Sequence, residues 1–190
     1  MKHTVLKNRF RAVLLPAMAS MALSGQVQAV TVNFDGELLD RPCQVAPESL
    51  QQEVTFLERP ARDFWTAPAR SPVEKFSIRL MECDTTSIWK VVRLKFTGTP
   101  ETNMAGQADY YLKVTGDNVG RLGIGLLDTD GRTPLKLGEF QNGGQGTQID
   151  GRDVVLTFGA FVQATPDAVA QKSVEPGQYT SAANFELTYE

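Results

Sequence analysis

Apolar and polar residues alternate along much of the chain. Phe76, Ile78 and Leu80, for example, are separated by Ser77 and Arg79. A period of two places the apolar side chains on one face of an extended strand. Other runs of this kind have their apolar residues at Val92, Leu94 and Phe96; Tyr110, Leu112 and Val114; Leu122, Ile124 and Leu126; Leu156, Phe158, Ala160 and Val162; and Phe185, Leu187 and Tyr189. Each run predicts a strand with one buried face.

Residues typical of turns separate these runs. Asp, Asn, Gly and Pro cluster at positions 128–131, 142–144, 150–151 and 176–177. Helical periodicity is scarce, and only residues 166–172 are expected to form a short helical turn. Short strands at this spacing predict an all-β fold, an antiparallel sandwich of immunoglobulin size. No linker composition divides the chain further, so we expect one folded domain.

The first 29 residues are typical of a secretory signal peptide. Basic residues precede an apolar stretch at 12–24, and the small residues Val27 and Ala29 flank a cleavage tripeptide. An uncleaved anchor helix is the disfavoured alternative, because the stretch is too short to cross a bilayer core of about 30 Å. We expect cleavage after Ala29 and export of residues 30–190.

Removal of this segment changes the charge and the available chemistry. The chain has 19 basic and 22 acidic residues, and loss of Lys2, Lys7, Arg9 and Arg11 leaves a net charge of −7. So acidic a chain is a poor candidate for binding nucleic acid or anionic membrane. The only histidine, His3, is lost as well. Ser-His-Asp, Cys-His and His-metal chemistry are thereby excluded, so we expect no enzyme, no cofactor, no metal and no small-molecule substrate.

Two cysteines, Cys43 and Cys83, remain after cleavage. In an oxidising compartment, two cysteines within one domain are most simply one disulfide. A thiol nucleophile or a metal site is the alternative, but there is no histidine partner and there are only two sulfurs. Closing this loop would stabilise the fold by about 4 kcal/mol on the chain-entropy model.

Three further features have a chemical and a structural interpretation. The glycine-rich stretches 120–125 and 142–146 lack a nucleotide-binding pattern and are expected to be a thin strand and a turn. Asp128 and Asp130 could be acid/base groups or calcium ligands, but their place in a turn favours solvated turn formers. The aromatic pair at 64–65 could stack on a sugar, although packing in the core or at a groove rim is favoured.

The two ends of the expected mature chain both alternate. Near the N-terminus, one face of an extended segment carries Val30, Val32, Phe34, Gly36 and Leu38. This segment is either an ordinary first strand or a strand that pairs elsewhere, and glycine suits a close approach by another chain. The C-terminal run 185–190 is either a buried sheet member or an edge awaiting a partner. Composition does not choose between these alternatives.

A series of short motifs along the chain bears on that choice. They lie at 38–43, 62–65, 70–72, 78–80, 112–116, 120–124, 126–131, 158–160, 164–166, 172–174 and 185–189. With both cysteines in place and in this order, they make the chain resemble the subunits of chaperone–usher pili, the pilins. Among these it is most similar to the adaptor type, which joins a tip fibre to a pilus rod.

The resemblance implies an incomplete immunoglobulin-like sandwich that lacks its final strand. In such subunits a periplasmic chaperone fills the resulting groove, and at the outer-membrane usher the N-terminal extension of the next subunit replaces the chaperone strand. By this resemblance, residues 30–40 are the donor-strand extension and residues 41–190 the pilin domain, with Gly36 as the glycine of the donor strand. The expected partners are the chaperone, the usher and neighbouring pilins, and the expected location is a cell-surface fimbrium.

The resemblance also implies which residues border the groove. The groove-edge strand that meets the chaperone is expected to include Gly177, Phe185, Leu187, Tyr189 and Glu190. Gly177 and Tyr189 stand where pilins carry a glycine fourteen residues from the C-terminus and a penultimate aromatic residue. The alternatives are another minor tip-fibre pilin, or a small single-domain adhesin that binds glycans through aromatic residues.

Overall fold

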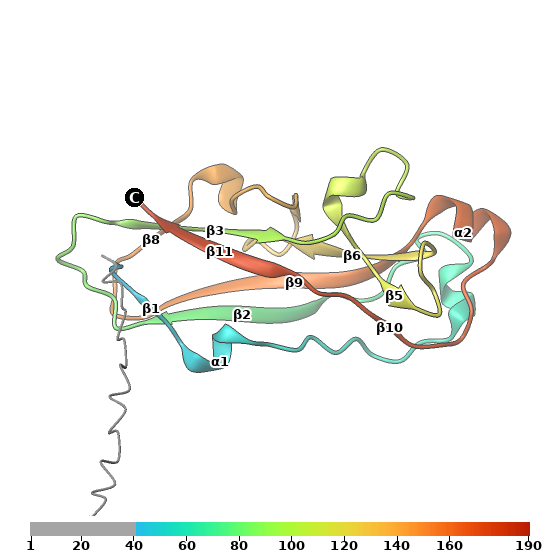
Figure 1. Cartoon of the computed structure of the whole chain (residues 1–190), viewed down its shortest axis with the longest axis horizontal. Coiled ribbons are helices and arrows are strands. Elements are labelled where there is room, and N and C mark those ends of the chain that lie inside the picture. The colour runs from blue at the N-terminus through green and yellow to red at the C-terminus, as the bar shows by residue number, and fades with distance from the viewer. Residues whose placement is uncertain (1–40) are drawn as a thin grey trace, which may run out of the picture. The chain divides into compact units, whose positions relative to one another are not determined.

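Residues 41–190 are described by the computed structural model, and they form two packed layers of antiparallel strands (Figure 1). One layer has the strand order β1-β2-β9-β6-β4, with β7 also paired to β6, and the other has the order β11-β3-β8. A separate short pair joins β10 to β5. The strands are β1 (Gln44–Val45), β2 (Glu74–Met81), β3 (Val91–Thr97), β4 (Tyr111–Lys113), β5 (Thr115–Gly116), β6 (Leu122–Leu127), β7 (Pro134–Leu135), β8 (Thr147–Gln148), β9 (Val154–Ala164), β10 (Tyr179–Thr180) and β11 (Asn184–Tyr189). The expected signal peptide and donor strand lie outside the described residues.

The core lies between the two layers and is built from the alternating runs. Phe76 on β2 is registered opposite Phe158 on β9, and Phe185 on β11 opposite Phe96 on β3. The rings of Phe96 and Phe158 meet across the layers with centroids 5.0 Å apart in an edge-to-face arrangement, which aromatic pairs prefer. The expected all-β, immunoglobulin-like sandwich is confirmed. Each alternating run contains a strand, but in the run at 110–114 only residues 111–113 form β4, because Tyr110 belongs to the short helical turn Ala108–Tyr110.

Short helices connect the strands. They are α1 (Pro47–Leu50), η1 (Ala61–Phe64), η2 (Ala108–Tyr110), η3 (Asn142–Gly144) and α2 (Pro166–Gln171). The α2 helix begins with a side-chain cap, in which the Ala168 amide donates to Thr165 Oγ1 at 3.3 Å. It ends at Lys172, whose backbone is left-handed. The predicted helical turn at 166–172 is therefore confirmed, whereas α1 and η1 were not expected from the sequence.

A disulfide joins Cys43 to Cys83, as predicted. Both cysteines are buried at one end of the sandwich. Next to the bond, the Asp84 amide donates to the Pro42 carbonyl at 2.7 Å. The bond therefore ties the beginning of the described chain to the loop that follows β2.

The turn at 128–131 has the structural role that the sequence favoured, but only Asp130 is solvated. Asp128 is 5% exposed, and its carboxylate oxygens accept the amides of Thr129 and Asn142, both at 2.6 Å. Asp130 Oδ1 accepts the amides of Arg132 and Thr133, both at 2.8 Å. The Thr133 hydroxyl donates to the other oxygen at 2.5 Å and lowers the pKa of the Asp130 carboxyl. Within residues 41–190, no group of three His, Cys, Asp or Glu side chains could hold a metal ion. No helix in the same range is long and apolar enough to cross a membrane.

Candidate functional site

The sandwich is open along the strand at the C-terminal end of the chain. β11 pairs with β3 on one side, and on its other side it pairs with no strand of the described chain. Residues 52–59 lie across from β11 and form an extended segment between α1 and η1. Within residues 41–190, the main-chain groups of this segment make no main-chain hydrogen bonds. We call residues 52–59 the opposite wall.

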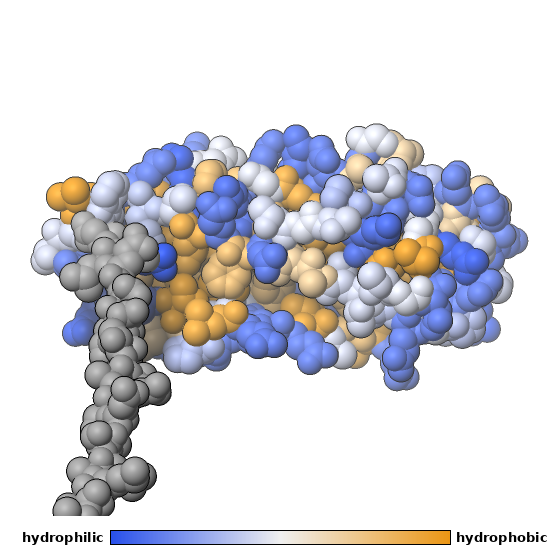
Figure 2. All heavy atoms as spheres, viewed as in Figure 1, coloured by the Kyte–Doolittle hydropathy of each residue, from blue (hydrophilic) through white to orange (hydrophobic). Residues whose placement is uncertain are grey.

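An apolar groove lies between β10–β11 and the opposite wall. It consists of two cavities, of about 820 and about 480 Å³, which share Gln52, Val54, Phe56, Ile124 and Ser181 in their linings. Figure 2 shows apolar surface in this region, bordered by polar surface on either side. The floor consists of core side chains from both layers: Phe64, Phe76, Ile78, Phe96, Leu112, Leu122, Ile124, Leu126, Ala160 and Val174. The groove therefore reaches down to the hydrophobic core, although apart from Phe76 these floor residues are at most 8% exposed.

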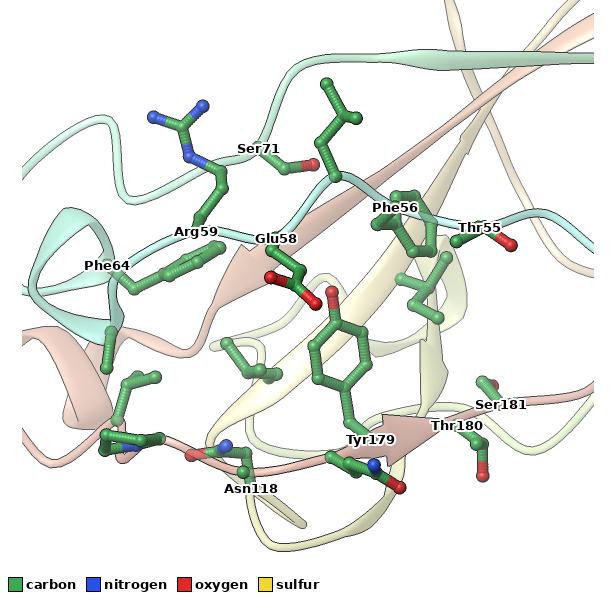
Figure 3. Close-up of a pocket in the computed structure, with 18 of the residues that line it drawn as sticks. Thr55, Phe56, Glu58, Arg59, Phe64, Ser71, Asn118, Tyr179, Thr180 and Ser181 are labelled. Carbon is green, nitrogen blue, oxygen red and sulfur yellow. The ribbon is translucent and has the colours of Figure 1, made fainter.

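The larger cavity lies at the end where the chain enters β10, and we call this the Gly177 end (Figure 3). The Phe56 and Tyr179 rings face each other here with centroids 6.4 Å apart. Burial raises the pKa of the Tyr179 hydroxyl. Behind them, Trp65 Nε1 donates to the Val174 carbonyl at 3.0 Å. This bond ties the segment after η1 to the chain that leads into β10.

A buried asparagine holds the same stretch of chain from the other side. Asn118 is 1% exposed. Its Nδ2 donates to the Glu175 carbonyl at 2.9 Å, and its Oδ1 accepts the Glu175 amide at 3.0 Å. Both main-chain groups of Glu175 are thus satisfied within the molecule, which fixes the wall at the Gly177 end.

The groove-edge residues expected from the sequence lie along β10–β11 and the chain leading into it. Gly177 lines the larger cavity and Phe185 the smaller. A Cβ at Gly177 would collide with the Asp117 side chain, which accepts the Gln178 amide at 2.8 Å. Glycine is therefore required at this point of the wall by the close approach of Asp117.

The other three expected residues continue the strand to the end of the chain. Leu187 and Tyr189 are half-buried against the core. Tyr189 Oη donates to the Cys43 carbonyl at 3.5 Å, and its burial raises the pKa of the hydroxyl, an effect that Arg41 partly opposes. The Glu190 carbonyl accepts the amides of Lys90 and Val91, both at 2.7 Å. The chaperone-binding role assigned to these residues stays a prediction, as does the donor role of Val30, Val32, Phe34, Gly36 and Leu38.

Sequence reasoning missed the opposite wall. Val54 and Phe56 are half-buried, whereas Glu53, Thr55 and Leu57 between and beyond them are exposed. This period-two signal was present, but it is too short to be separated from a loop without the groove in view. The aromatic pair at 64–65 packs as favoured, since Phe64 is 6% exposed and the Trp65 indole is hydrogen-bonded within the fold.

Comparison with known sequences adds independent evidence. The family described as "Fimbrial protein" matches residues 32–190. The fimbrial adapter PapK of Escherichia coli is 52% identical over 178 residues, which cover 94% of this chain and 96% of PapK. The uncharacterized fimbrial-like protein YdeS of Escherichia coli K12 is 31% identical over 162 residues, covering 84% and 85% of the two chains.

Comparison with solved structures gives the same fold. The crystal structure of the P pilus rod subunit PapA has a TM-score of 0.60 at 23% identity and covers 79% of this chain and all of that one. A structure of a chaperone-usher pilus has a TM-score of 0.62 at 24% identity and covers 90% of this chain and all of that one. The two-layer sandwich described above is therefore similar to that of pilus subunits.

Proposed function

The chain belongs to the Fimbrial protein family, and from this membership we propose that it is an adaptor subunit of a chaperone–usher pilus that polymerises by donor-strand exchange. It would be exported through the periplasm, held there by a chaperone, passed to an outer-membrane usher and built into a cell-surface fimbrium. The adaptor role, linking a tip fibre to a rod, is supported by 52% identity to a fimbrial adapter along nearly the whole of both chains. The role is structural, in keeping with the family.

The observation that carries this proposal is the pair of unpaired main-chain edges over an apolar floor. One further strand laid between β11 and the opposite wall would hydrogen-bond to a strand edge that otherwise has no partner in residues 41–190. Its alternate side chains would enter the two cavities. The missing element is therefore a strand with one apolar face, supplied by another chain.

The N-terminal segment has the sequence of such a strand. Burial of Val30, Val32, Phe34 and Leu38 at about 1.5–3 kcal/mol each would contribute roughly 6–12 kcal/mol before ordering costs. That is comparable with the whole stability of a small domain. The subunit would accordingly be poorly stable alone and stable once its groove is filled.

Periplasmic co-expression with the cognate chaperone tests this function. We expect a soluble one-to-one complex with the chaperone, and aggregation or proteolysis without it. A variant lacking residues 30–38 should still bind the chaperone but fail to fill the groove of the subunit incorporated before it. As a matched control, alanine at Thr31 and Asn33, on the polar face of the same segment, should leave joining intact.

Two outcomes would contradict the proposed function. A stable, soluble monomer recovered from the full chain without a chaperone would contradict the proposal. Such a monomer would have a closed core and would not need a strand from another chain. Incorporation of the variant lacking 30–38 at the normal rate would contradict the donor role specifically.

A further inference from the structure

The two cavities of the groove differ in the charge at their rims. The smaller cavity has no charged residue in its lining. The larger cavity, at the Gly177 end, has Glu53, Glu58, Arg59 and Glu175. Charge that meets an incoming strand is therefore concentrated at one end of the groove.

The charge left uncompensated at the Gly177 end is negative. Arg59 is paired with Asp63 at 2.9 Å, and Glu175 with Arg121 at 3.3 Å. Glu53 and Glu58 have no ion pair in the part of the chain that the structure describes. In Figure 3 the Glu58 side chain extends into the space towards Tyr179, whereas Arg59 points away from it. An incoming strand would thus pass two free carboxylates on the opposite wall.

The N-terminal extension of this same chain carries its charges in its second half. Its polar positions are neutral at Thr31 and Asn33 and acidic at Asp35 and Glu37, with Asp40 beyond. As a strand, residues 30–40 would span about 33 Å. Residues 179–189 have the same number of positions, so the extension matches β10–β11 in length.

Strand direction decides which half of the extension meets the acidic rim. β10–β11 begins at the Gly177 end and runs away from it. A strand added antiparallel to β11, the more stable pairing, would end at the Gly177 end. The extension of a second copy would then bring Asp35, Glu37 and Asp40 to the cavity that holds Glu53 and Glu58.

We propose that the groove selects its donor strand by charge: it excludes the extension of a second copy of this chain and takes a strand from a different polypeptide whose polar positions at the Gly177 end are neutral or basic. This inference rests on the proposed function and specifies its partner. Like charges placed opposite each other in neighbouring strands are destabilising, and such repulsion suppresses wrong pairings. The consequence is a subunit that does not polymerise with itself.

The test uses the full chain purified as its complex with the periplasmic chaperone. Two peptides are added at low salt: residues 30–40 of this chain, and the same peptide with Asp35→Asn, Glu37→Gln and Asp40→Asn. Release of the chaperone is followed by native mass spectrometry. We expect the neutral peptide to enter about tenfold faster, the ratio that corresponds to two or three repulsive cross-strand pairs. At 0.5 M salt the ratio should fall towards one, because the repulsion is screened.

Variants of the subunit locate the effect. Glu53→Gln with Glu58→Gln should remove most of the preference for the neutral peptide. Glu82→Gln with Asp150→Asn, two exposed acidic residues that do not line the groove, should leave the preference unchanged. The inference is overturned if both peptides enter at the same rate at low salt, or if the preference survives the wall variant. If neither peptide enters and no other alternating apolar strand does so, the proposed function fails as well, and the two failures are thereby distinguished.

Discussion

β9 and β11 have the same alternating pattern but different surroundings. β9 is paired on both sides, by β2 and β6, and its inward residues Leu156, Phe158 and Val162 are at most 1% exposed. β11 is paired on one side only, and its inward residues Phe185 and Leu187 are half-buried. Both strands send apolar side chains to the same core, so the missing neighbour accounts for the difference in burial.

The contrast teaches where the stability of this subunit comes from. Around β9 the free energy is gained from contacts within the chain. Along β11 part of the same gain is made only when another strand arrives, because apolar side chains at the edges of the groove, such as Phe56 and Phe185, are still partly exposed to water. Assembly and folding are therefore driven by the same hydrophobic burial.

The largest expected effect comes from closing the open side. A peptide matching a cognate donor strand should raise the midpoint of thermal unfolding steeply, because anything that binds only the folded state stabilises it. The gross burial is of the order of 6–12 kcal/mol. Differential scanning calorimetry of the subunit with and without the peptide measures the shift. A peptide with the apolar and polar positions exchanged is the control and should have no effect.

The next largest effect comes from truncating one phenylalanine side chain in β9 and one in β11. Phe158→Ala should cost about 3–5 kcal/mol, since Phe158 is buried among Phe76 and Phe96. Phe185→Ala should cost less in the open subunit and approach the cost of Phe158→Ala only after a strand fills the groove. Urea unfolding with and without bound strand measures both. An equal cost for the two changes in the open subunit would show that β11 is already as well packed as β9.

A smaller effect is expected from loss of the hydrogen bond between Trp65 and Val174 at the Gly177 end. Trp65→Phe removes the indole donor from the Val174 carbonyl and should cost about 1 kcal/mol. Strand entry should slow because this wall is no longer held in place. Thermal unfolding and the rate of peptide entry provide the two readouts. Asn142→Ala removes a side-chain bond to the Gly146 carbonyl, and neither residue lines a cavity of the groove. This variant is the control and should leave the entry rate unchanged.

The smallest effect is a pH dependence at the open strand. Burial raises the pKa of Tyr179 and Tyr189 above the ordinary value of 10.0. A raised folded pKa means that stability is fully present below pH 10 and is lost as the pH rises from there through the folded values. Ultraviolet absorbance titration should show these two tyrosines ionising last, and later still when a strand fills the groove. Tyr189→Phe should reduce the loss of stability at high pH, and an unchanged pH profile would contradict the assignment.

Much of the fold followed from local patterns. Alternation at 76–80 and at 156–162 predicted β2 and β9 because strand geometry places every second side chain on one face. Residues 166–172 were expected to form a short helical turn, and the α2 helix lies there. The two cysteines predicted their own bond, since no other thiol was available. These features depend on neighbouring residues or on a count, and the sequence alone determines them.

The site depended on contacts between distant parts of the chain. Alternation at 185–189 indicates which face of β11 is buried, but it carries no information on whether a strand lies beside it. The tertiary structure decided three features of the site. The opposite wall faces β11, Asn118 holds Glu175, and Glu53 and Glu58 border only one cavity. The physical reason is that a side-chain period records the surroundings of one strand's face, whereas an edge is open or closed according to which other segments the folded chain brings to it.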